Sequence, residues 1–152
     1  MVYALGGDVC HLARSVLARD LVALFDELLA EKVYVGVSAG SMIFSRHLNP
    51  YTAAMFAEDD DPTGVAPPFG YFDWFLVPHW RSDFAPERDD EWAERIEREV
   101  DFPLYFIDDE TAVQVRSDGA SHADPVVDVI SEGRWRLLGS WRCRPHRCLA
   151  VA

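Results

Sequence analysis

Cysteine is scarce in this 152-residue chain: it occurs only as Cys10, Cys143 and Cys148, and no two of these are spaced as Cys-x-x-Cys. An odd number of cysteines without a repeated spacing argues against a disulfide framework. The lack of a Cys-x-x-Cys pair argues against a structural zinc site. The sequence therefore predicts a reduced protein that uses no metal and no cofactor.

Basic residues are also scarce, because 14 lysines and arginines stand against 26 aspartates and glutamates, for a formal net charge of -12. Without a basic patch to neutralise phosphates, neither nucleic acid nor an anionic membrane is expected as a partner. No apolar run approaches the roughly 20 residues of a membrane span. Residues 1–8 lack the basic start and long apolar stretch of a secretory signal. These absences predict a cytoplasmic protein with a solvated acidic surface.

Apolar residues, in contrast, make up 49% of the sequence, which is enough for the core of one domain over residues 1–152. The first apolar run predicts a strand at Val2–Leu5. Leucine, valine and phenylalanine then recur at helical spacing from Leu12 to Leu29. We expect Asp8 to cap this helix and a break to fall near Asp20.

Strands and helices continue to alternate along the chain. The remaining expected elements are strands at Val33–Val37, Phe72–Val77 and Leu104–Ile107, helices at Met42–His47 and Asp89–Val100, and C-terminal strands at Ala112–Arg116, Val126–Ile130 and Arg134–Leu138. Residues 49–70 are expected to form a long irregular loop, and the Arg-rich tail over 141–152 is ambiguous. This order predicts an α/β fold with a mostly parallel sheet and C-terminal β-hairpins.

The sharpest chemical feature is the segment Gly36-Val37-Ser38-Ala39-Gly40 between an expected strand and an expected helix. A Gly-x-Ser-x-Gly turn in that position presents the serine hydroxyl at the carboxyl end of the strand. Its small neighbours allow a substrate carbonyl to come close. The segment therefore makes Ser38 a candidate nucleophile.

A serine nucleophile needs a base, and the base needs a group that orients it. His79 is the best candidate base among five histidines, because it follows an expected strand, where open α/β sheets place their sites. Three acidic residues, Asp108, Asp109 and Glu110, follow the next strand, and their spacing does not choose among them.

Two glycines, Gly6 and Gly7, follow the first strand and can let backbone amides approach a ligand. Together with the amide of Ala39, at the start of the helix after Ser38, they could supply an oxyanion hole.

These elements, in this order, resemble the aspartyl dipeptidase (peptidase E) and cyanophycinase family of serine peptidases. The resemblance is carried by four segments: Gly6–Asp8, Tyr34–Ile43, Phe72–Trp80 and Ile107–Ala112. The second of them is similar to the family's nucleophile segment almost residue for residue. The resemblance implies a three-layer α/β/α fold of the class I glutamine amidotransferase-like type.

By that resemblance Ser38 is the nucleophile, His79 is the general base and Asp109 is the acid. The family also implies an oxyanion hole formed by the amides of Gly7 and Ala39.

The resemblance further implies a peptidase for small peptides, including dipeptides with an N-terminal aspartate. Asp8 stands where the dipeptidases usually have asparagine, and Trp92 stands near the position where aspartate-specific members have an arginine. We expect Asp8 and Arg81 to bind substrate, and Arg46 and Arg88 are further candidates for a substrate carboxylate.

Members of that family have more chain before the Gly-Gly strand, enough for about two βα units. Their lack here implies uncovered apolar surface. A fragment, a covering partner subunit and a misplaced start codon all stay open, and we expect a homodimer.

Two other interpretations of the sequence stay open. An esterase of the α/β-hydrolase type has the order nucleophile, acid, histidine, which Asp109 followed by His122 or His146 would satisfy. A non-catalytic relative that binds a ligand or partner is the second, because the N-terminal region is short.

Overall fold

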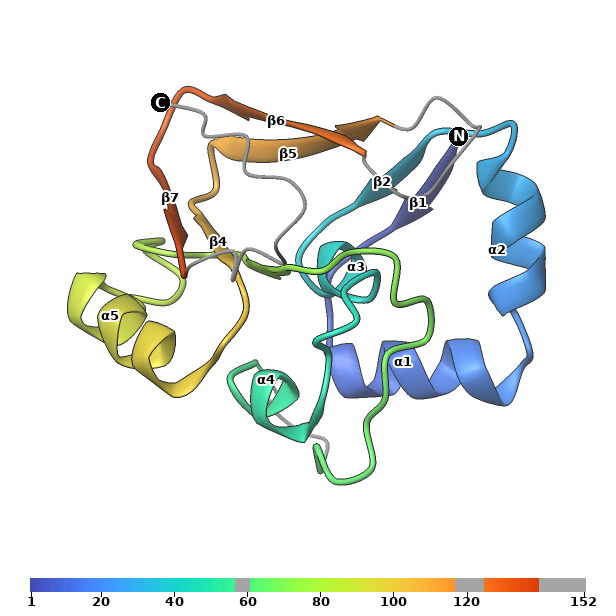
Figure 1. Cartoon of the computed structure of the whole chain (residues 1–152), viewed down its shortest axis with the longest axis horizontal. Coiled ribbons are helices and arrows are strands. Elements are labelled where there is room, and N and C mark those ends of the chain that lie inside the picture. The colour runs from blue at the N-terminus through green and yellow to red at the C-terminus, as the bar shows by residue number, and fades with distance from the viewer. Residues whose placement is uncertain (57–60, 117–124, 140–152) are drawn as a thin grey trace, which may run out of the picture.

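The computed structural model describes residues 1–56, 61–116 and 125–139 of the chain (Figure 1). Its helices are α1 (Val9–Ala18), α2 (Val22–Leu29), α3 (Ala39–Met42), α4 (Pro50–Ala54) and α5 (Asp90–Glu99). Its strands are β1 (Val2–Ala4), β2 (Tyr34–Gly36), β3 (Phe75–Val77), β4 (Leu104–Ile107), β5 (Thr111–Arg116), β6 (Val126–Ser131) and β7 (Trp135–Leu138).

Parallel pairs form the centre of the fold. Strand β1 pairs with β2, and β3 pairs with β4, both in parallel. Strand β7 adds to β4 in the antiparallel direction, and β5 and β6 form an antiparallel hairpin. The predicted α/β class, the parallel pairing and the C-terminal hairpin are therefore confirmed.

The main core lies on the helical side of β3 and β4. Because side chains alternate along a strand, Phe75 and Val77 of β3 face the same side as Leu104 and Phe106 of β4, and all four are fully buried. Helices α1, α3, α4 and α5 lie on this side and contribute side chains to the same apolar cluster (Figure 1).

The opposite face of β3 and β4 is covered by the β5–β6 hairpin (Figure 1). Leu76 and Ile107 point to this side and belong to a second apolar cluster with Trp74 and Tyr105. Valines from both hairpin strands pack against that cluster. Burial on both faces explains why these two strands are apolar at every position.

The first helical region begins and breaks as the sequence predicts. The Oδ1 atom of Asp8 accepts a hydrogen bond from the backbone N–H of His11, 2.7 Å away, which satisfies a donor at the start of α1. Asp20 adopts a positive φ of 52° between α1 and α2, a conformation that ends a helix.

The helix predicted at Met42–His47 is wrong, because α3 ends at Met42. Ser45 leaves the helical path to form a parallel bridge with Phe72, and its hydroxyl donates to the carbonyl of Trp74, 2.6 Å away. These tertiary partners satisfy backbone groups that a longer helix would have paired internally.

The loop predicted over residues 49–70 is partly wrong, because it begins with helix α4. Asn49 and Thr52 form a reciprocal capping box, and Pro50 occupies the first helical turn. Residues 57–60 of this loop, the tail over 140–152 and the candidates His122 and His146 lie outside the described residues.

One face of the β1–β2 pair is apolar and open to solvent. Tyr3, Leu5, Val33 and Val37 alternate onto this face and are between 48% and 69% exposed. The uncovered apolar surface expected from the sequence is therefore present on these strands.

No helix within the described ranges has the length and apolar character needed to cross a membrane.

Candidate active site

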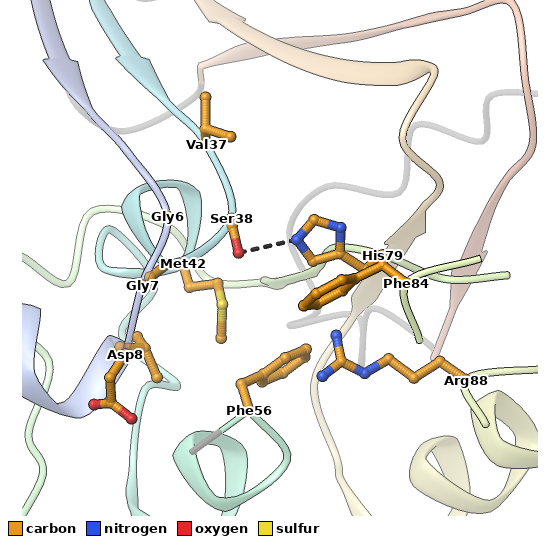
Figure 2. A pocket seen from close by; sticks show the side chains of 12 residues that line it. Gly6, Gly7, Asp8, Val37, Ser38, Met42, Phe56, His79, Phe84 and Arg88 are labelled. Carbon is orange, nitrogen blue, oxygen red and sulfur yellow. Dashed lines mark hydrogen bonds between the residues drawn. The ribbon is translucent and has the colours of Figure 1, made fainter. Parts of the chain in front are cut away.

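Ser38 occupies a tight turn between β2 and α3. Its backbone has φ 51° and ψ -119°, a conformation that L-residues rarely adopt. The turn reverses the chain directly after the strand, so that the hydroxyl projects from the carboxyl end of β2 into a pocket (Figure 2). The hydroxyl is therefore accessible to a ligand while its backbone is held in a fixed geometry.

The two glycines that flank this turn are required for close backbone packing. A Cβ atom on Gly36 would lie 2.6 Å from the carbonyl carbon of Gly40, and one on Gly40 would lie 2.8 Å from the carbonyl carbon of Ala4. Both distances are shorter than real Cβ contacts. Glycine at these positions therefore lets α3 pack directly against β1 and β2, which fixes the position of Ser38.

His79 reaches Ser38 from the end of β3. It follows Pro78 and has a positive φ of 61°, which is uncommon for a residue with a side chain. Its Nε2 atom lies 3.0 Å from Oγ of Ser38 (Figure 2). The backbone of the next residue, Trp80, donates to the carbonyl of Ile107, 3.0 Å away, and so ties this turn to β4.

Asp109 completes the arrangement from the end of β4. Its Oδ1 atom lies 2.7 Å from Nδ1 of His79. With a proton on Nδ1, His79 donates to Asp109 and its Nε2 atom can accept the hydroxyl proton of Ser38. The parallel pairing of β3 with β4 brings these two strand ends side by side.

The neighbouring acids do not contact His79. The carboxylate of Asp108 accepts hydrogen bonds from the N–H of Glu110 and from Oγ1 of Thr111, and it also accepts the backbone N–H of Arg134. Asp108 therefore links the turn that leads into β5 with the turn that follows β6. Glu110 is exposed, and its carbonyl accepts a hydrogen bond from the backbone N–H of Glu132.

Ser82 also contacts Asp109, a role that sequence reasoning missed, because its only signal was its nearness to His79. The Ser82 hydroxyl donates to Oδ2 of Asp109. This hydrogen bond, assisted by the one from His79, holds the pKa of the Asp109 carboxyl below its usual range. Asp109 is therefore ionised at neutral pH and can stabilise positive charge on His79.

A pocket of about 490 Å³ opens in front of Ser38 and His79 (Figure 2). It combines a glycine-rich wall, apolar side chains and a few charged groups. Its lining residues are Gly6, Gly7, Asp8, Val9, Val37, Ser38, Ala39, Met42, Phe56, His79, Phe84 and Arg88.

The predicted oxyanion-hole residues, Gly7 and Ala39, both line this pocket beside Ser38. Gly7 has φ 132°, a conformation that favours glycine, and a Cβ there would meet no atom within 4 Å. Ala39 is the first residue of α3, so its N–H has no partner inside the helix. Both residues therefore lie in the wall of the pocket beside Ser38, and their role as an oxyanion hole stays a prediction.

The predicted substrate-binding residues lie differently. Arg81 is not part of the pocket lining, because its guanidinium binds the carboxylate of Asp90 at the start of α5, with Nε 3.0 Å from Oδ1. Asp8 does line the pocket, but in Figure 2 its carboxylate turns away from Ser38 toward α1, which it caps. Its Oδ2 atom is buried and has no hydrogen-bond partner among the described residues.

Arg88 was one of the further arginine candidates. Among the described residues that line the pocket, it is the one with a permanently positive side chain. It is buried, and its guanidinium carbon lies 4.6 Å from the centroid of the Phe56 ring. The side chain extends into the space below His79 and Phe84 (Figure 2).

No cluster of three potential metal ligands occurs in the described part of the chain.

The fold and the site together define the class of protein: an α/β protein with a hydrogen-bonded serine, histidine and aspartate at the carboxyl ends of three strands, as in serine hydrolases. The chain belongs to peptidase family S51, whose family profile matches residues 1–123.

The structure is also similar to a crystal structure of a protein from Listeria monocytogenes EGD-e assigned as a peptidase E. The TM-score is 0.62 at 19% sequence identity, and the match covers 86% of this chain. This likeness shows a shared fold. The chain spans 60% of the length of that protein. A comparison with curated proteins found no match.

Proposed function

We propose that this protein is a serine peptidase that hydrolyses small peptides by way of an acyl-enzyme. The observation that carries the proposal is the continuous hydrogen-bond path from Ser38 through His79 to Asp109, with distances of 3.0 Å and 2.7 Å. Membership of peptidase family S51 supports the same reaction class.

In the first half of the proposed reaction, Ser38 Oγ attacks the carbonyl carbon of the scissile bond while Nε2 of His79 takes the hydroxyl proton. Negative charge develops on the carbonyl oxygen, and the amides of Gly7 and Ala39 stabilise it. His79 then donates its proton to the leaving amine, which departs and leaves an ester on Ser38.

In the second half, a water molecule replaces the leaving group. His79 accepts a proton from this water as it attacks the ester, and the same oxyanion site stabilises the second tetrahedral intermediate. Ser38 leaves with the proton from His79, which restores the resting state. Throughout, ionised Asp109 keeps the imidazole in one orientation and stabilises its protonated form.

We propose that the preferred substrates are short peptides with an acidic N-terminal residue, and that Arg88 binds the acidic group. A buried guanidinium in the wall of a partly apolar pocket attracts a carboxylate more strongly than one at the surface, because less water screens it. Arg81 is less suited to this role, since it lies outside the pocket lining. Asp8 stays a proposed substrate contact, since it also lines the pocket.

Replacing Arg88 by methionine should raise KM for Asp-Leu by roughly 10- to 100-fold, the range for losing a hydrogen bond to a charged group. Hydrolysis of Ala-Leu should change little. Arg81→Met is the matched control, because it removes an arginine of the same loop that lies outside the pocket lining. Steady-state kinetics on both dipeptides test the proposal. An equal loss on both substrates would instead assign Arg88 a structural role beside Phe56.

The function as a whole is tested by incubating the folded chain with Asp-Leu, Glu-Leu, Asn-Leu and Ala-Leu, followed by chromatography of the released amino acids. We expect release of the N-terminal residue, fastest from the two acidic dipeptides. Release of none of them by a folded sample would contradict the proposal and favour the non-catalytic interpretation.

We also propose that the chain forms a homodimer. The exposed apolar face of the β1–β2 pair, formed by Tyr3, Leu5, Val33 and Val37, supports this proposal, since contiguous apolar surface of this kind is typical of association sites.

A further inference from the structure

Ser82 is the buried polar residue nearest to the proposed catalytic groups that the mechanism above does not use. It lies in the loop that leaves His79, is 6% exposed, and contacts the Asp109 carboxylate oxygen that does not face His79. Its hydroxyl takes part in two hydrogen bonds. It accepts one from the backbone N–H of Phe84, 3.2 Å away, and it donates the other to Oδ2 of Asp109.

The direction of these hydrogen bonds follows from the donors available. A serine hydroxyl carries a single proton, and the Phe84 amide can only donate. An ionised carboxylate can only accept. The Ser82 proton is therefore directed to Asp109, and the loop that carries Ser82 holds the hydroxyl in this orientation.

The two oxygens of Asp109 have separate partners as a result. Oδ1 faces His79 and Oδ2 faces Ser82. The Asp109 side chain is 52% exposed, so the surrounding protein leaves it room to turn. Two hydrogen bonds on two different oxygens fix the rotation of the carboxylate, whereas one alone would allow it to swing toward solvent.

The backbone of the same loop keeps Ser82 in place. The N–H of Ala85 donates to the Ser82 carbonyl and the N–H of Arg88 donates to the Ala85 carbonyl, each over 3.0 Å. These turns make the segment from His79 to Arg88 a compact unit that carries the base at one end and a pocket arginine at the other.

We propose that Ser82 is a positioning residue of the peptidase site, whose hydroxyl fixes the Asp109 carboxylate so that Oδ1 stays directed at His79. This inference rests on the proposed function. It assigns Ser82 no contact with substrate, so its effect should appear in kcat through Asp109 and leave KM unchanged.

A double-mutant cycle tests this role. Ser82→Ala should lower kcat by roughly 10- to 100-fold in the native background, as expected for loss of a hydrogen bond to a charged group. In an Asp109→Asn background it should lower kcat by less than about twofold, because residues that act through one another are not additive. An equal factor in both backgrounds, or no change in either, would overturn the inference.

Two further variants keep the test independent of folding. Ser82→Thr retains the hydroxyl and should keep most of the native kcat, while Ser82→Cys has nearly the same shape with a weak donor and should behave like Ser82→Ala. Ser45→Ala is the matched control, because Ser45 is equally buried and donates to a carbonyl at 2.6 Å, outside the pocket lining. It should leave kcat unchanged. A loss of kcat in Ser82→Thr as large as in Ser82→Ala would contradict the role of the hydroxyl.

A measurement without substrate separates this inference from the proposed function. NMR titration of the Asp109 carboxyl should show its pKa rising in Ser82→Ala, since the Ser82 hydrogen bond is the largest cause of the lowered value. An inactive native chain would contradict the peptidase proposal while this titration still decides whether Ser82 holds Asp109. An unchanged pKa would overturn the positioning role even in an active enzyme.

Discussion

Replacing Ser38 by alanine should lower peptide hydrolysis by roughly 10⁴- to 10⁶-fold, the range seen when a serine nucleophile of this kind is removed. Alanine keeps the backbone and Cβ of the turn and removes the oxygen that lies 3.0 Å from Nε2 of His79. No acyl-enzyme can then form. Turnover of Asp-Leu by purified native and variant chains measures the effect, and thermal unfolding of both shows whether the fold is unchanged.

A second substitution at this position separates chemistry from folding. Ser38→Gly should be as inactive as Ser38→Ala, yet more stable by about 1 kcal/mol, because glycine relieves a conformation that costs a residue with a side chain about 1–3 kcal/mol. The positive φ of 51° at Ser38 is the reason for this expectation. Chemical denaturation compares the free energies of unfolding. Full activity in either variant would exclude Ser38 as the nucleophile.

Much of this site could be predicted because its residues follow strands that are strongly marked in the sequence. The runs that form β2, β3 and β4 are short, apolar and bounded by turn residues. The parallel pairing of β3 with β4 places His79 beside Asp109, and Ser38 follows β2, which pairs with β1. The close packing of Gly36 and Gly40 explains why the turn around Ser38 has such a recognisable sequence.

The spacing of the three consecutive acids does not identify the one that faces His79, and only the family resemblance pointed to Asp109. Side chains of adjacent residues in a turn point in different directions. Which of them faces His79 depends on contacts with backbone groups far away in the sequence. Asp108 binds the turn at Arg134, which leaves Asp109 to face the histidine. Sequence spacing carries no information on that contact between residues 26 positions apart.

Side-chain contacts within short loops could not be predicted from the sequence either. Arg81 and Arg88 have the same chemistry, and only the turns of their loop place one against Asp90 and the other in the pocket. The early end of α3 has a similar cause. Ser45 forms a bridge with Phe72 and a hydrogen bond to the carbonyl of Trp74, and it does not continue the helix. In each case a tertiary contact decides a local outcome that propensity leaves open.

Replacing His79 by alanine should lower hydrolysis about as much as the loss of Ser38, roughly 10⁴- to 10⁶-fold, because nucleophile and base act as one unit. Without Nε2, the Ser38 hydroxyl has no acceptor for its proton, and the leaving amine has no donor.

His47→Ala is the matched control for this substitution. His47 is also part of a histidine–carboxylate pair, with Nε2 3.0 Å from Oδ1 of Asp73, but it stacks on Phe102 and lies outside the pocket lining. It should retain the native kcat. The same pair of variants distinguishes the two triad orders considered from the sequence. Substantial activity in His79→Ala would favour the order nucleophile, acid, histidine, with His122 or His146 as the base, whereas its selective loss supports the path from Ser38 through His79 to Asp109.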